Sequence, residues 1–172
     1  MHIYLSYLLL LALVASPVTA QDDKMTEVVK TEVKKMIDAT TGGKYEVVVA
    51  LTHPKVLEEL GGKEKAGQKV KEGMEAGKAQ GFTFEVKEIN KPTVVKNKRN
   101  YFAVTPYTMV VTGLGKKATL KTAVVGVSTN EGKTWKFVNL AAGGEDEVRR
   151  FLPALPHELK VPRQEQTIED IQ

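Results

Sequence analysis

The stretch that decides the fold is YFAVTPYTMVVTGLGKKATLKTAVVGVSTNEGKTWKFVN, from Tyr101 to Asn139. Apolar and β-branched residues dominate it, and clusters of Gly, Asn and Lys divide it into segments of strand length. The predicted strands are Tyr101–Thr112, Ala118–Ser128 and Thr134–Leu140, and the turns between them are Gly113–Lys117 and Asn130–Gly132. Only Pro106 interrupts the first strand. This pattern predicts an antiparallel meander.

The chain before this stretch changes from helical to strand periodicity at Gly81. Phe82, Phe84, Val86 and Ile89 begin the period-two pattern, and Pro92 marks a strand edge. The predicted helices upstream are Asp22–Thr40, Tyr45–Leu51, Val56–Leu60 and Lys63–Gln80. The second of these has the β-branched composition of a strand, but a His-Pro step and another short helical stretch follow it at once. We therefore expect a short buried helix there.

The chain after the meander is short and polar. Glu145–Leu152 is predicted to be a closing helix, Pro153–Pro162 an extended surface segment, and Arg163–Gln172 a disordered polar tail. We therefore expect one α+β domain over residues 21–152, with helices packed on one face of a curved antiparallel sheet. Residues 153–172 would lie outside it.

Residues 1–20 have the form of a secretory signal peptide. Leu5–Val14 is apolar and too short to span a bilayer, Pro17 ends it, and Val18-Thr19-Ala20 places small residues before Gln21. We expect cleavage after Ala20 and a periplasmic or secreted protein with no stable membrane anchor. An uncleaved anchor is the weaker alternative, because the small residues stand where a signal peptidase needs them.

Composition excludes several function classes. The chain has 25 Lys and Arg against 21 Asp and Glu, and both signs are mixed along it, which indicates a solvated surface rather than a nucleic-acid interface. It has no cysteine, so disulfides, thiol nucleophiles and thiolate metal sites are excluded. With only three histidines in the chain, we expect no metal and no cofactor.

Two segments carry a resemblance to a known family. KYEVVVALTHPKVLEELGG, residues 44–62, resembles the second-helix region of secreted members of the nuclear transport factor 2-like superfamily, the cystatin-like cone. GVSTNEGKTWKFVN, residues 126–139, resembles the final hairpin of the same sheet. The resemblance covers about Met25–Leu152 and implies an exported, bacterial-type cone with a cavity. It leaves function open, because this fold hosts isomerases, dehydratases, cyclases and binding domains.

Residues 128–135, STNEGKTW, also resemble the Asp-box turn of sialidases, with Asn130 where that pattern has Asp. The motif is a folding element, because the polar side chains of its first residues bond the turn backbone. We expect Gly132 to take a positive φ and Trp135 to be buried beneath the turn. A sialidase would need repeated copies and an arginine-rich site, and the sequence has neither.

The candidate ligand-binding residues are amphipathic side chains and one histidine: Tyr45, His53, Tyr101, Tyr107 and Trp135. Each of the four aromatics also fits an ordinary core role, and the histidine, although it could act as a general base, fits a loop that packs at a helix junction. The chain has no aspartate between Asp38 and Asp146, and Glu85 and Glu88 fit a solvent-facing strand side.

The expected function is a non-catalytic exported domain that binds a small apolar or amphipathic ligand or a protein partner. A small lyase or isomerase, acting through a tyrosine–histidine or glutamate pair in the cavity, is the alternative. We expect no nucleic-acid partner, and association into a homodimer is left open.

Overall fold

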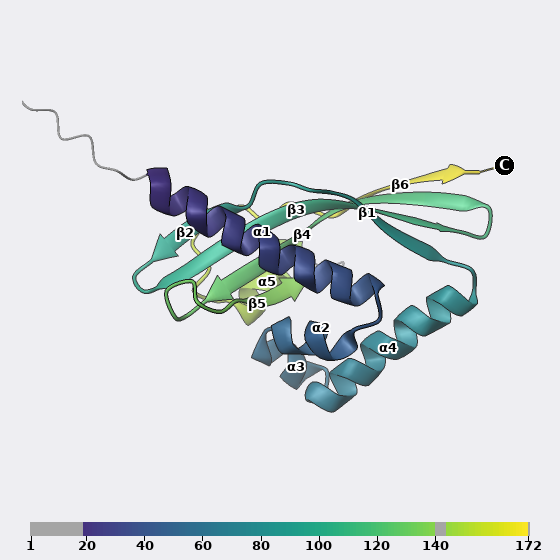
Figure 1. Cartoon of the computed structure of the whole chain (residues 1–172), viewed down its shortest axis with the longest axis horizontal. Helices are drawn as coiled ribbons and strands as arrows, with labels where there is room; N and C mark the ends of the chain where they lie inside the picture. The colour runs from purple at the N-terminus through teal and green to yellow at the C-terminus, as the bar shows by residue number, and fades with distance from the viewer. Residues whose placement is uncertain (1–18, 140–143, 172) are drawn as a thin grey trace, which may run out of the picture.

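The computed structural model describes residues 19–139 and 144–171 (Figure 1). The predicted signal peptide lies outside them except for Thr19 and Ala20, which open the first helix. The helices are α1 (Thr19–Thr41), α2 (Tyr45–Leu51), α3 (Pro54–Glu59), α4 (Lys63–Ala79) and α5 (Gly144–Phe151). The strands are β1 (Thr83–Ile89), β2 (Thr93–Asn97), β3 (Asn100–Gly113), β4 (Lys116–Ser128), β5 (Lys136–Asn139) and β6 (Glu165–Asp170).

The long β3–β4 hairpin is the centre of a six-stranded antiparallel sheet. β1 and β2 lie one after the other along the outer side of β3, and β5 and β6 do the same along β4. We call the half of the sheet with β2 and β5 the proximal end, and the half with β1 and β6 the distal end. The α+β fold expected from the sequence is confirmed.

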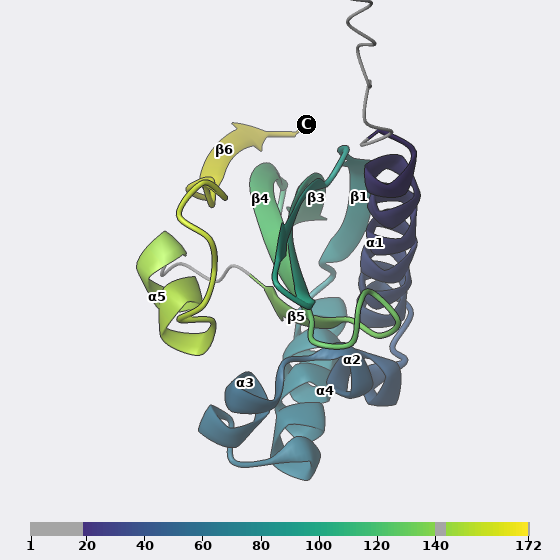
Figure 2. The same cartoon turned by 90° about the vertical axis from the view of Figure 1, so that its left-hand side faces the viewer.

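Helices cover both faces of the proximal end, which corrects the expectation of helices on one face. Figure 2 shows α1 on one side of the sheet and α5 on the other. One core joins α1 residues such as Val33 to Ala103 and Val124, and a second joins α5 residues such as Val148 to Phe102 and Val125. The reason is visible in the strands, where residues 101–105 and 122–128 are buried without alternation. Such continuous apolar runs are typical of strands covered on both faces.

The C-terminal segment belongs to the domain, so the predictions of a surface segment and a disordered tail are wrong. Leu155, Leu159 and Val161 are 2%, 0% and 6% exposed in the α5-side core. The polar residues that follow form β6, which pairs with β4 from Lys116↔Asp170 to Lys121↔Glu165. A polar strand can occupy a sheet edge, because its backbone groups are satisfied by the neighbouring strand and its side chains remain in water.

Pro106 does not interrupt β3. It lies opposite the connection between β1 and β2, where its carbonyl accepts a hydrogen bond from the Asn90 N–H at 2.9 Å. In an antiparallel strand the N–H and C=O of one residue point to the same side, so the missing Pro106 N–H faces this connection. The ladder with β4 therefore loses no hydrogen bond, and β3 continues to Gly113.

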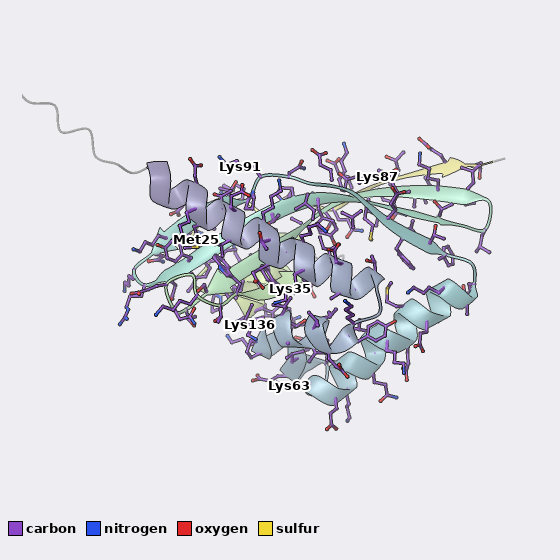
Figure 3. All side chains as sticks on the ribbon, in the orientation of Figure 1. Met25, Lys35, Lys63, Lys87, Lys91 and Lys136 are labelled. Carbon is purple, nitrogen blue, oxygen red and sulfur yellow. The ribbon has the colours of Figure 1, made fainter. Side chains whose placement is uncertain are left out.

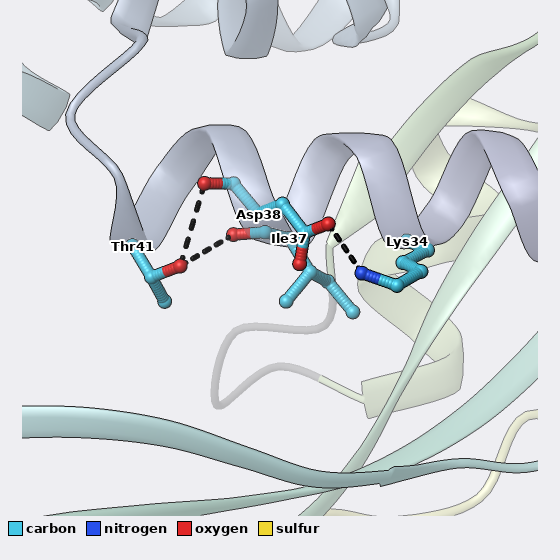
Figure 4. Close-up of polar contacts among 4 residues, drawn as sticks. All are labelled: Lys34, Ile37, Asp38 and Thr41. Carbon is cyan, nitrogen blue, oxygen red and sulfur yellow. Dashed lines mark hydrogen bonds and ion pairs between the residues drawn. The ribbon is translucent and has the colours of Figure 1, made fainter.

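The helix boundaries follow local chemistry. At the end of α1, the Thr41 hydroxyl donates to the carbonyls of Ile37 and Asp38 at 3.2 and 3.4 Å, and Lys34 pairs with Asp38 at 2.5 Å (Figure 4). The Asp38 carbonyl also accepts from the Gly42 N–H at 2.9 Å, so the Thr41 hydroxyl adds further bonds to carbonyls of the last helical turn. The Tyr45–Leu51 segment is a helix as predicted, and its Val48 and Leu51 are buried.

The Asp-box-like turn is confirmed. The Gly132 N–H donates to Ser128 Oγ and the Thr134 N–H to Asn130 Oδ1, both at 2.9 Å. Gly132 has a φ of 83°, and Trp135 is 2% exposed beneath the turn. The turn also supports α1, because a Cβ on Gly132 would lie 2.4 Å from the Met25 side chain.

Candidate functional site

A cleft of about 1270 Å³ lies between α2, α3 and α4. Its apolar wall comes from α2 and α3 and includes Tyr45, Val49 and Leu57. Its other wall is α4, whose lining residues recur at the i, i+4 spacing of one helix face from Lys63 to Glu75. That stretch of helix is about 20 Å long at 1.5 Å per residue, so the cleft is elongated.

A backbone connection to the sheet fixes the apolar wall. The His53 N–H donates to the Phe137 carbonyl of β5 at 2.8 Å, and Thr52 forms an isolated bridge with the same residue. Pro54 then begins α3, a position that favours proline because the first helical N–H groups have no intrahelical partner. The His-Pro step therefore sets the angle between α2 and α3 and, with it, the shape of this wall.

The α4 wall of the cleft lies close to α2 at Gly67. A Cβ on Gly67 would lie 3.4 Å from Val49 Cγ2, so any larger side chain there would extend into the space between α4 and α2. Farther along α4, a Cβ on Gly77 would lie 3.2 Å from the Phe84 ring of β1. Ala66 is the buried residue of α4, so this helix is held by few side chains.

The rim of the cleft is charged but balanced. It carries four lysines and four glutamates: Lys44, Lys63, Lys71, Lys136, Glu46, Glu58, Glu64 and Glu75. Figure 3 shows Lys63 and Lys136 on the side of the molecule where α2, α3 and α4 gather. Lys136 donates to the Ala50 carbonyl near the end of α2, so its ammonium group is fixed at the rim. A balanced rim gives no net attraction for a strongly charged ligand.

The structure does not bring the five predicted site residues together in one cavity. Tyr45 lines the cleft. Tyr101, Tyr107 and Trp135 are 4%, 6% and 2% exposed and belong to the core under α1. They lie there because α1 packs directly on the face of the sheet that carries them, and its apolar side chains fill the space that a cavity would need.

His53 lies at the α2–α3 junction, beside the residues that line the cleft but not among them. Its ring Nδ1 is buried and has no hydrogen-bond partner. Burial, followed by the nearby Lys55, lowers the pKa of His53 below its ordinary value of 6.5. The ring is therefore held in its neutral form, which agrees with packing at the junction.

Two other groups have shifted pKa values, and they lie elsewhere. Burial raises the pKa of Tyr107, whose hydroxyl donates to Asn139 Oδ1 at 3.3 Å under α1. A hydrogen bond from Arg149, at 2.8 Å, lowers the pKa of Glu145 on α5. These two residues and His53 occupy three separate parts of the fold, so the shifted groups form no convergent acid–base pair.

Sequence reasoning missed the residues of the α4 wall. Their charged side chains are typical of an ordinary solvated helix face, and only Gly67 gives a local signal, since glycine inside a helix is unfavourable unless space requires it. Over residues 19–139 and 144–171, no three His, Asp or Glu side chains gather in a way that could hold a metal ion. None of the helices described is both long and apolar enough to cross a membrane.

Comparisons of the chain with protein-family models, with curated proteins and with solved structures found no match. The likeness to the nuclear transport factor 2-like superfamily therefore stays a prediction from the two sequence segments. The site has to be interpreted from its own geometry.

Proposed function

We propose that this chain is an exported, non-catalytic domain that binds a small amphipathic ligand in the cleft between α2, α3 and α4. The observation that carries the proposal is the cleft itself, whose volume of about 1270 Å³ is enough for a small organic molecule. One wall is apolar and the rim is polar, so a ligand with an apolar body and a polar end would satisfy both. The balanced rim favours a ligand of low net charge over a polyanion.

The absence of catalysis is proposed from the placement of the titratable groups. Acid–base chemistry needs a positioned group with a shifted pKa beside the substrate. Tyr107 is buried under α1, and Glu145 lies on the opposite face of the sheet. A lyase or isomerase in the cleft would use Tyr45, which lines it, with His53, which lies beside it, or a pair of the glutamates that line it.

Export is proposed from the apolar run before Pro17 and the small residues before Gln21. α1 begins at Thr19, so cleavage after Ala20 would remove only its first two residues. The rest of the helix, including the buried Val29 and Val33, would remain on the sheet. We also propose that the domain is a member of the nuclear transport factor 2-like superfamily, which the helix-then-meander layout supports.

The cleft can be tested with two matched variants of α4. Gly67→Phe places a ring where the helix faces Val49, whereas Gly73→Phe places the same ring where no atom lies within 4 Å of the new Cβ. Both changes replace a helical glycine, so their effects on helix propensity are the same. A naphthylamine dye, whose fluorescence rises in apolar surroundings, serves as the ligand probe.

We expect the dye to bind the wild type and the Gly73→Phe variant with similar affinity. Gly67→Phe should weaken binding about tenfold or more, because the ring occupies the cleft. Equal binding by all three proteins would show that the dye binds elsewhere and would overturn the assignment of the site.

A further inference from the structure

α4 forms one wall of the cleft but is weakly packed on the rest of the fold. Ala66 is the one buried residue among its 17, whereas α1 buries residues such as Val29 and Val33 on the sheet. Val70 and Met74, which follow Ala66 at helical spacing, are only half-buried. Because tertiary packing supplies most of the stability of a helix in a protein, α4 receives much less of it than α1.

The sequence of α4 is also a poor helix former. It contains Gly67, Gly73 and Gly77, and a glycine inside a helix lowers the equilibrium constant for helix formation about fivefold relative to alanine. Close packing accounts for Gly67, where a Cβ would lie 3.4 Å from Val49, and for Gly77, where it would lie 3.2 Å from Phe84. A Cβ on Gly73 would meet nothing within 4 Å. Gly73 therefore weakens the helix without improving its packing.

Glycines also stand at both ends of α4. Gly61 and Gly62 precede it with φ values of 91° and 97°, and Gly81 follows it with a φ of 81°. These conformations are strained for other residues and cost glycine little. Gly62 is the N-cap and has no side chain that could accept from the free N–H groups of the first turn. The chain can therefore change direction at either end of α4 at little conformational cost.

The polar contacts of α4 add little to this weak packing. Lys78 Nζ donates to the Thr41 carbonyl at the end of α1 at 3.1 Å, and Lys71 and Glu75 form an ion pair at 4.0 Å within the helix. The three charged side chains are exposed, so water competes for their hydrogen bonds and screens their charges. Breaking these contacts should cost the molecule little.

The apolar wall of the cleft is attached more firmly. α2 buries Val48 and Leu51, and the segment after it is joined to β5, where the His53 N–H donates to the Phe137 carbonyl at 2.8 Å. Thr52 forms an isolated bridge with the same residue of β5. The cleft therefore has one wall fixed to the sheet and one wall of low local stability.

We propose that α4 is the gate of the cleft: it unfolds locally while α1 and the sheet stay folded, and it refolds over a bound ligand. Segments that open for ligands are drawn from the least stable parts of a fold. Only the folded helix completes the cleft, so a ligand there favours folded α4. The ligand in this scheme rests on the proposed function, but the opening of α4 is a property of the free protein.

Hydrogen exchange followed by mass spectrometry measures this opening without a ligand, because the amides of a helix exchange when its hydrogen bonds break. After correction for the intrinsic rates, we expect the amides of α4 to exchange about a hundredfold or more faster than those of α1 between Val29 and Ile37. Equal protection of the two helices would overturn the proposal.

Two matched substitutions at exposed positions separate local from global unfolding. Gly73→Ala strengthens α4 and should slow the exchange of its amides about fivefold. Lys30→Gly weakens α1 by about the same factor. If α4 opens while α1 stays folded, Lys30→Gly leaves the exchange of α4 unchanged. If Lys30→Gly accelerates α4 as much as α1, the helix opens only with the whole domain and the proposal is wrong.

The naphthylamine dye tests whether the opening is coupled to the cleft. At about ten times its dissociation constant, a dye that needs folded α4 should slow the exchange of α4 about tenfold. A dye whose binding Gly67→Phe weakens, but which leaves the exchange of α4 unchanged, would overturn the gate. A dye that does not bind would count against the proposed binding function, and the exchange of the free protein would still decide whether α4 opens.

Discussion

Replacing Trp135 tests whether the Asp-box-like turn stabilises the fold as the structure indicates. The side chain is 2% exposed, stacks on Phe137 with ring centroids 6.5 Å apart, and lies over Gly126, where an added Cβ would be 3.0 Å from its Cε3 atom. Trp135→Ala would leave a large cavity between the turn and the sheet. Truncation of a buried aromatic to alanine costs about 3–5 kcal/mol in unfolding free energy.

A second substitution separates ring packing from hydrogen bonding. Trp135 Nε1 is buried and has no hydrogen-bond partner, so Trp135→Phe loses no bond and keeps an aromatic ring against Phe137. We expect it to cost roughly 1–2 kcal/mol, from the lost apolar contact alone. The prediction therefore includes the ratio of the two losses in unfolding free energy, with Trp135→Ala losing more than Trp135→Phe.

The assay is thermal and urea unfolding followed by far-ultraviolet circular dichroism, because the chain has a single tryptophan and the variants lose its fluorescence. For a domain of this size, about 3–5 kcal/mol corresponds to a fall in Tm of roughly 6–20 °C. A loss below about 1 kcal/mol for Trp135→Ala would refute the burial argument. Equal losses for both variants would show that the phenyl ring restores none of the lost packing, because both variants remove Nε1 alike.

Three further predictions concern pH and processing. The pKa of His53 is below its ordinary value of 6.5, so the unfolded chain takes up this proton first and the free energy of unfolding should fall as pH drops below 6.5. In urea titrations, His53→Gln should reduce the dependence of the unfolding free energy on pH in this range. An unchanged dependence would contradict the prediction. The pKa of Tyr107 is above 10.0, so the free energy of unfolding should fall as pH rises past 10.0. In a pH titration, part of the tyrosine absorbance change should occur at higher pH than the rest, and Tyr107→Phe should remove that part. If it persists in the variant, it belongs to another tyrosine. Mass spectrometry of protein secreted by the native host should find Gln21 as the first residue, and an intact Met1 in that fraction would refute cleavage.

Local chemistry made some elements predictable. The Asn130–Gly132 turn could be read directly, because each residue has a role that depends only on its neighbours: a side-chain acceptor, a positive φ and a tight reversal. The helix at Tyr45–Leu51 was predictable only from context, since its valines favour a strand. The context was the His-Pro step and the second short helical stretch that follow this segment at once.

The candidate site could be predicted only in part, because side-chain type does not reveal which layer covers a residue. Tyr45 and Tyr107 have the same amphipathic side chain, yet one lines the cleft and the other lies under α1. The α4 wall gave no signal beyond Gly67, because a charged helix face looks the same whether it meets water or borders a cleft. The unbroken apolar runs in β3 and β4 did contain the information that both faces are buried.

The sequence by itself determined the order of helices and strands, the two tight turns around β4 and the α+β class, because these depend on periodicity and on backbone preferences within a few residues. Only the tertiary structure decided that α5 and Leu159 cover the second face of the sheet, and that Glu165–Asp170 forms an edge strand. It also decided that the cleft lies among the helices rather than inside the sheet. Those outcomes depend on contacts between residues far apart in the chain, whose free energy no local pattern contains.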